Sequence, residues 1–146
     1  MRQFTLELPG DLPVWNANSR GNHYQRATTV RRWRETVAWT ARAARIPRLG
    51  RVDVELMLIP CNRRRRDPDN LAGALKPALD GIVDAGILDD DSSQHVASVT
   101  LRIATPRPAL TAHRWLLSVW ELPDDADETI LPASELVDDL DGEGAA

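Results

Sequence analysis

The sequence predicts an α/β (α+β) fold, in which a mixed β-sheet of about four strands packs against two main helices. Two observations lead to this prediction. Several short segments alternate apolar and polar residues, and two longer segments repeat apolar residues every three or four positions. Along the chain these segments follow the order β-α-β-α-β-β. A chain of 146 residues is long enough to fold as one domain around a single core.

The first part of the domain contains a strand, a long loop and a helix. Apolar and polar residues alternate over 4–8, just before a Pro-Gly pair, and this pattern predicts the first strand. Residues 9–27 are rich in Pro, Gly and Asn, and we expect them to form a loop. A helix is predicted over about 28–44, with Thr28 or Thr29 as its N-cap.

The second part contains three predicted strands and one helix. Alternating apolar residues predict the second strand over 52–59, and a proline closes it. A helix is expected over about 69–85, where a glycine ends it. The third and fourth strands are predicted over 96–103 and 115–122, and we expect them to pair as a hairpin.

The charge is distributed unevenly along the chain. All 18 basic residues but only 13 of the 22 acidic residues lie within 1–123, so this part carries a net charge of +5. The rest is acidic and poor in large apolar residues, a composition typical of disorder. We therefore predict one domain over 1–122 and a disordered acidic tail over 123–146. The basic domain favours a polyanionic partner.

Composition also excludes several classes of protein. Cys61 is the only cysteine, so the chain can form neither an internal disulfide nor a zinc site built from cysteines. No apolar stretch approaches the roughly 20 residues that span a bilayer. The N-terminal residues lack the pattern of a secretory signal peptide. We expect a cytoplasmic protein without a membrane partner.

One face of the second predicted helix carries charged residues. On an α-helix, Lys76 and Asp80 lie within about 20° of Asp69, and the apolar residues cluster on the opposite side. Lys76 is the only lysine among 18 basic residues. Its presence in a chain that otherwise uses arginine indicates that a compact, mobile ammonium is required there. An ordinary i,i+4 ion pair between Lys76 and Asp80 would also explain their spacing.

Asp67 and Asp69 place two carboxylates at a strand-to-helix turn. Magnesium prefers hard oxygen ligands, and the start of a helix offers free N–H groups to a phosphate. A nuclease needs both a metal that polarises the phosphodiester and a site that holds the anion. The alternative is structural, because either aspartate can cap or stabilise the first turn of the helix.

The run Asp89-Asp90-Asp91 forms a second acidic cluster before the third strand. Three adjacent carboxylates repel one another, and a bound cation relieves this repulsion. A well-hydrated turn explains such a run equally well.

Basic and aromatic residues near these acids are candidates for DNA contacts. Four arginines, Arg63, Arg64, Arg65 and Arg66, directly precede the Asp67 turn and can hold phosphates, although such a run also suits a solvated loop. In the long loop, Arg20 and Arg26 accompany the aromatic residues Trp15, His23 and Tyr24. The aromatic rings can stack on unpaired bases, and core packing is an alternative for Trp15.

Taken together, three segments resemble the RusA family of Holliday junction resolvases. They are Arg65-Arg66-Asp67-Pro68-Asp69-Asn70-Leu71, Lys76-Pro77-Ala78-Leu79-Asp80-Gly81-Ile82 and Gly86-Ile87-Leu88-Asp89-Asp90-Asp91-Ser92. The order of strands and helices also matches, so the resemblance covers residues 3–122. It implies a RusA-like fold and a homodimer, each subunit of which binds Mg²⁺, with Mn²⁺ as a substitute, and nicks one strand of a four-way junction.

The resemblance also implies roles for individual residues. Asp67, Asp69 and Asp91 match the metal-binding carboxylates, and Asp90 lies close enough to share that role. Lys76 matches the active-site lysine, whose charge would stabilise the scissile phosphate. Two residues match supporting positions of the motif, namely Asn70 and Asp80.

One spacing differs from the commonest form of the motif. There the lysine follows the second aspartate by four residues, whereas Lys76 follows Asp69 by seven. On an α-helix this change keeps the direction of the side chain but moves it about 4.5 Å along the axis. The difference suggests a phage-type branch with its own preferred substrate. Two other hypotheses are a branched-DNA-binding protein without cleavage and a nucleotide-sugar transferase whose Asp67-Pro68-Asp69 turn holds a metal-diphosphate.

Overall fold

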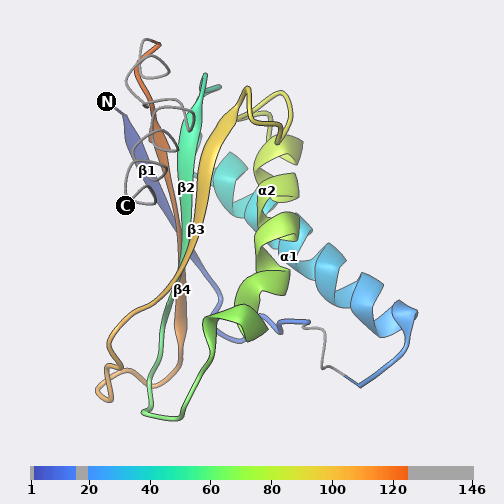
Figure 1. Cartoon of the computed structure of the whole chain (residues 1–146), viewed down its shortest axis with the longest axis vertical. Helices are drawn as coiled ribbons and strands as arrows, with labels where there is room; N and C mark the ends of the chain where they lie inside the picture. The colour runs from blue at the N-terminus through green and yellow to red at the C-terminus, as the bar shows by residue number, and fades with distance from the viewer. Residues whose placement is uncertain (1, 16–19, 125–146) are drawn as a thin grey trace, which may run out of the picture.

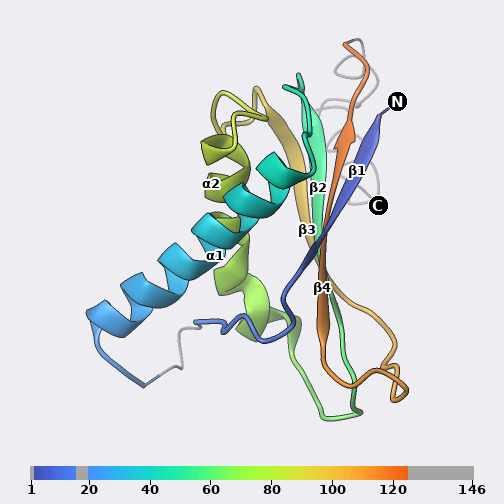
Figure 2. The same cartoon turned by 180° about the vertical axis from the view of Figure 1, so that it is seen from behind.

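The computed structural model describes residues 2–15 and 20–124 and has an α+β fold. Figure 1 shows two helices on one face of a twisted four-stranded sheet. Figure 2 shows the same two layers from behind, with one helix running diagonally across the other. The predicted fold class is therefore confirmed. The predicted acidic tail lies outside the described residues from 125 onward, as do residues 16–19 of the predicted loop.

Four strands form one mixed sheet with the spatial order β1-β4-β2-β3. Their bounds are Gln3–Leu8 for β1, Val52–Ile59 for β2, Val96–Ile103 for β3 and Arg114–Glu121 for β4. β4 is antiparallel to both β1 and β2, while β2 and β3 are parallel. The predicted strand positions agree with these bounds to within a residue or two.

The predicted hairpin between the third and fourth strands is wrong, because β2 lies between them. The link between β3 and β4 crosses the end of β2. In this link the amide of Ala104 donates to the carbonyl of Leu58 at 2.8 Å, and the amide of Arg107 donates to the carbonyl of Pro60 at 2.8 Å. These backbone hydrogen bonds carry the chain past β2 to its far side, a route that strand periodicity does not reveal.

The first helix, α1, spans His23–Ala43 and begins five residues before the predicted start. Its N-cap is Asn22, which forms a capping box: its side-chain oxygen accepts from the Gln25 amide at 3.0 Å, and the Gln25 side chain accepts from the Asn22 amide at 3.3 Å. The Thr28 hydroxyl instead donates to the carbonyl of Tyr24 within the helix. The prediction of a Thr28 or Thr29 cap, and of a loop as far as residue 27, is therefore wrong.

The second predicted helix consists of two different segments. A 3₁₀ helix, η1, spans Pro68–Ala74, and the α-helix α2 spans Leu75–Asp84. Because a 3₁₀ helix has three residues per turn, the α-helical wheel that aligned Asp69 with Lys76 does not apply before residue 75. The predicted end is confirmed, since Gly86 follows the C-cap in the left-handed region at φ 80°. In the described part of the chain, neither α-helix is long and apolar enough to cross a membrane.

The core lies between the helices and the inward face of the sheet. One row of leucines crosses all four strands in register, namely Leu6, Leu117, Leu56 and Leu101. From the helix layer, the ring of Trp33 on α1 meets Trp115 on β4 edge to face, with 5.1 Å between centroids. Both tryptophans are buried, so the two layers are joined by aromatic as well as aliphatic contacts.

Gly81 allows α1 and α2 to approach closely. A Cβ at this position would lie 2.6 Å from the Cβ of Val37 and 2.7 Å from the carbonyl oxygen of Arg34. Alanine normally favours a helix by about 1 kcal/mol over glycine. We expect Gly81→Ala to have the opposite effect and to lower the free energy of unfolding by about 1–3 kcal/mol through overpacking. Urea denaturation measures the change, with Gly50→Ala as control because no atom lies within 4 Å of its Cβ position. Equal or greater stability of Gly81→Ala would show that the contact is not tight.

Candidate active site around Lys76

The turn that follows β2 leaves the carboxylate of Asp67 available. Asp67 occupies the N-cap position of η1 with an extended backbone, but its side chain makes no capping hydrogen bond. Its backbone carbonyl instead accepts from the amide of Asn70 at 3.1 Å, which closes the turn. The exposed side chain lies 3.5 Å from Nε of Arg65. The geometry therefore does not support the alternative that the Asp67 side chain caps the helix.

Asp69 and Lys76 line one pocket although they belong to different helical segments. Asp69 lies on η1 and Lys76 in the first turn of α2, and Arg26 of α1 lines the same pocket. Both Asp69 and Lys76 are exposed. Both residues thus line one pocket, although a 3₁₀ segment joined to an α-helix places them there and not the continuous α-helix that was predicted.

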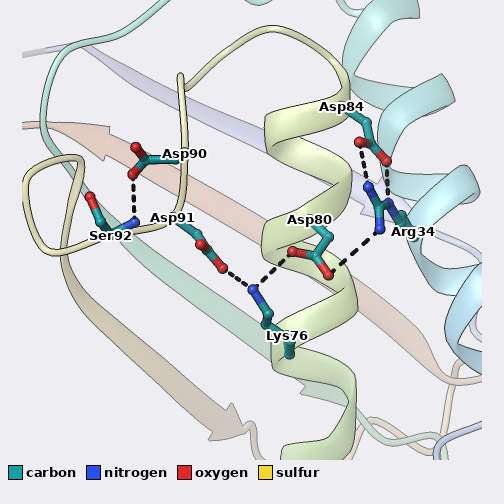
Figure 3. Close-up of polar contacts among 7 residues, drawn as sticks. All are labelled: Arg34, Lys76, Asp80, Asp84, Asp90, Asp91 and Ser92. Carbon is teal, nitrogen blue, oxygen red and sulfur yellow. Dashed lines mark hydrogen bonds and ion pairs between the residues drawn. The ribbon is translucent and has the colours of Figure 1, made fainter.

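Lys76 contacts two carboxylates (Figure 3). Its ammonium donates to Asp91 in the loop before β3 and lies 3.0 Å from Oδ1 of Asp80, one turn along α2. The hydrogen bond to Asp91, followed by that to Asp80, raises the pKa of Lys76 above its ordinary value. These contacts therefore favour the charged form of the lysine. The i,i+4 pair was evident from the sequence, and the contact with Asp91 was not.

An ion pair between Arg34 and Asp84 extends this network from α2 to α1. The guanidinium of Arg34 donates to both oxygens of Asp84, at 2.5 and 2.8 Å, and its Nη1 lies 4.0 Å from Oδ2 of Asp80. This bidentate contact raises the pKa of Arg34 and lowers that of Asp84. As Figure 3 shows, Asp80 thus lies between two cations, Lys76 on one side and Arg34 on the other. The sequence contained no signal for Arg34, because residues on separate helices are paired only by the fold.

The three adjacent aspartates point to three different partners. Asp89 pairs with Arg48, and Asp91 pairs with Lys76. Asp90 accepts a hydrogen bond from the amide of Ser92 at 2.8 Å, and the contacts with Ser92 lower its pKa. The repulsion within the run is therefore relieved by separate contacts. Of the two candidates in this run, Asp91 is the one that points toward Lys76.

The predicted metal ligands are only partly brought together. Among residues 2–15 and 20–124, no three His, Cys, Asp or Glu side chains form a group able to hold a metal ion. The predicted set of Asp67, Asp69, Asp90 and Asp91 therefore does not form a ready-made cluster in this part of the chain. Of this set, Asp91 contacts Lys76, and Asp69 lines the same pocket as Lys76.

The predicted DNA-binding arginines divide into two groups. Arg66 is held in its loop, where it donates to the side chain of Asn62 at 2.7 Å and to the carbonyl of Arg64 at 2.9 Å. It also lies 3.3 Å from Nε2 of His113, whose pKa is lowered by burial and by the nearby arginines. These contacts hold the Arg66 guanidinium against its own loop, and its contact with DNA stays a prediction. The other predicted arginines are exposed, namely Arg20, Arg26, Arg63, Arg64 and Arg65.

Comparisons with protein-family models and with curated proteins found no match to this chain. The resemblance to the RusA family therefore remains a prediction that rests on the three motif segments. The functional assignment depends on these motifs and on the geometry around Lys76.

Proposed function

We propose that this chain is a Mg²⁺-dependent endodeoxyribonuclease that nicks branched DNA, such as four-way junctions, in recombination and repair. The supporting observation is the position of the only lysine. Lys76 contacts Asp91 from the loop after α2 and shares a pocket with Asp69 from η1. Lys76 thus contacts one of the other two motif segments through Asp91 and lines the same pocket as Asp69 of the remaining one, together with Arg26 on α1.

The chemistry of the acidic side chains fits Mg²⁺. Asp67, Asp69 and Asp91 would hold the ion, with Asp90 as a further donor nearby, and all of them offer hard carboxylate oxygens. Asp67 and Asp69 are exposed, and Asp67 is not used as a cap, so both can rotate toward a common ligand. Mn²⁺ suits the same donors. When bound, the ion would polarise the scissile phosphodiester and activate the attacking water.

Lys76 would stabilise the negative charge that develops on the scissile phosphate. The hydrogen bonds to Asp91 and Asp80 raise the pKa of Lys76, which favours the charged ammonium that this role needs. Asp80 would act as a positioning residue, since its carboxylate holds the ammonium at 3.0 Å and is itself held near Arg34. Asp91 would be shared between Lys76 and the metal ion.

The exposed arginines would bind the DNA backbone. Arg63, Arg64 and Arg65 directly precede the Asp67 turn, and Arg26 lines the pocket next to Lys76. Contacts with phosphates give affinity without sequence preference, which suits an enzyme that recognises the shape of its substrate. Two copies of the chain would cut two opposed strands of a junction, and we therefore propose a cytoplasmic homodimer of RusA-like fold.

The test is cleavage of a labelled four-way junction beside a linear duplex, with Mg²⁺ or with EDTA. We expect paired symmetric nicks in the junction with Mg²⁺, none with EDTA, and little cutting of the duplex. Tight binding without cleavage in either Mg²⁺ or Mn²⁺ would instead favour a non-catalytic branched-DNA-binding protein. The absence of a preformed group of three acids in the described residues is the observation that favours this alternative. If the protein neither binds nor cleaves the junction, both functions are refuted.

A further inference from the structure

The pocket next to Lys76 combines cations with apolar surface. It has a volume of about 610 Å³ and lies between the loop before α1, α1 itself and the η1–α2 segment. Arg26 and Lys76 contribute positive charge, and Asp69 contributes one negative charge. Trp15, Val30 and Pro77 supply apolar surface. Its size is that of a typical small-ligand site, so a single nucleotide can enter it.

Two glycines allow Trp15 to lie at this pocket. A Cβ on Gly73 would lie 1.9 Å from the carbonyl oxygen of Trp15, so the backbone of the loop rests directly on η1. A Cβ on Gly21 would lie 2.7 Å from Cη2 of the Trp15 ring, and the φ of 155° at Gly21 is one that side chains rarely allow. The backbone of Trp15 therefore lies against η1, and one edge of its indole lies close to Gly21, just before the N-cap of α1. A ring whose backbone is packed against a helix loses less entropy when it stacks on a ligand than one on a free loop.

Trp15 is not part of the buried core of the described residues. Trp33 and Trp115 are 1% and 2% exposed and belong to the core cluster, whereas Trp15 is only partly buried. The core-packing alternative for Trp15 is therefore not supported. A partly exposed aromatic ring next to two cations matches the two parts of a nucleotide, since the base stacks on the ring and the phosphate meets the cations.

On this basis we propose that the pocket binds one unpaired nucleotide of the DNA substrate. The base lies against Trp15, and its phosphate contacts Arg26 and Lys76. A base inside a continuous duplex is stacked on both sides and cannot enter such a pocket, whereas a base at a branch point, bulge or flap can. The pocket would thus supply part of the selectivity for branched DNA. This inference rests on the proposed function, because it assumes that DNA is the substrate.

The test compares binding of two DNAs in EDTA, where the proposed cleavage does not occur. One is a linear duplex, and the other is the same duplex with a single unpaired 2-aminopurine, whose fluorescence reports on stacking. We expect Trp15→Leu to weaken binding of the bulged DNA by about 5- to 150-fold, the range for loss of one base–aromatic stack. Binding of the linear duplex should change less than twofold, and the fluorescence change should disappear.

Three controls give each outcome a definite meaning. Trp39→Leu removes another exposed tryptophan, 70% exposed on α1 and outside this pocket, and should leave both affinities unchanged. Trp15→Phe keeps an aromatic ring and should retain most of the selectivity, and a thermal melt verifies that Trp15→Leu is folded. If Trp15→Leu weakens the binding of both DNAs equally, or of neither, the inference is overturned while the nuclease proposal stays intact. If the unaltered protein binds neither DNA but cuts junctions, the pocket inference alone fails; without binding or cleavage, both proposals fail.

Discussion

Asp69→Asn and Asp91→Asn are each expected to reduce Mg²⁺-dependent cleavage of a four-way junction by at least about 100-fold, without weakening the binding of the junction. Each substitution keeps the size of the side chain but removes the anionic oxygens that a hard cation requires. Affinity for DNA should stay equal or rise slightly, because the protein loses negative charge near the phosphates. Single-turnover cleavage and gel-shift binding measure the two quantities separately.

Asp89→Asn is the matched control for Asp91→Asn. The two residues belong to the same acidic run, but Asp89 pairs with Arg48 and Asp91 with Lys76. The Asp89→Asn variant should therefore cleave the junction at nearly the rate of the unaltered protein. Normal cleavage by Asp69→Asn would remove this residue from the metal site. Equal loss in Asp89→Asn and Asp91→Asn would mean that the run acts only through its total charge.

The strands were predictable because apolar residues alternate along each of them, and β1, β2 and β4 each have one buried face. In β1, Leu6 and Leu8 are buried while Thr5 and Glu7 are exposed, and this alternation is visible in the sequence. Alternation identifies the face of a strand but not its neighbour. The position of β2 between β3 and β4 depends on contacts such as that between Arg107 and Pro60, which are distant in sequence. The hairpin prediction failed for this reason.

Helix starts were less predictable because several residues can cap. Asn22 and Thr28 are both favourable N-cap types, and only the reciprocal bonds of Asn22 with Gln25 select the earlier start. Similarly, the apolar spacing after Pro68 is compatible with an α-helix, but the segment is a 3₁₀ helix as far as Ala74. The close approach of the Trp15 backbone at Gly73 is a tertiary contact that periodicity does not contain.

The candidate site was predictable only in its local contacts. The pair of Lys76 and Asp80 follows from a spacing of four residues on a helix. The contact between Lys76 and Asp91 joins α2 to the loop beyond it, and the direction of each aspartate in that loop depends on its turn. Arg34 reaches Asp80 from another helix. Composition singled out Lys76 as the only lysine, and the structure identified the residues around it.

Lys76→Ala is expected to lower the cleavage rate at saturating DNA by about 100- to 1,000-fold, comparable with the loss of one preorganised donor to a developing charge. Lys76→Arg keeps the charge, but its planar guanidinium does not replace a compact ammonium between Asp80 and Asp91, so we expect only partial recovery. Asp80→Asn should cost about 10-fold in rate, because it loosens the position of Lys76 without removing it. Rates and dissociation constants measured separately distinguish these effects from weaker DNA binding.

Because Lys76 is the only lysine, its charge can also be tested by chemical modification. Acetylation removes the charge of the ammonium, whereas reductive dimethylation keeps it, and each reagent changes the charge of the terminal amine as it changes that of Lys76. If Lys76 acts through its charge, acetylated protein should lose cleavage as Lys76→Ala does, while dimethylated protein should keep a substantial part of it. Equal loss with both reagents would show that the hydrogen-bond donors of the unmodified ammonium matter more than its charge. Full activity after acetylation, verified by mass spectrometry at Lys76, would exclude the lysine from catalysis and leave its contacts with Asp80 and Asp91 a structural role.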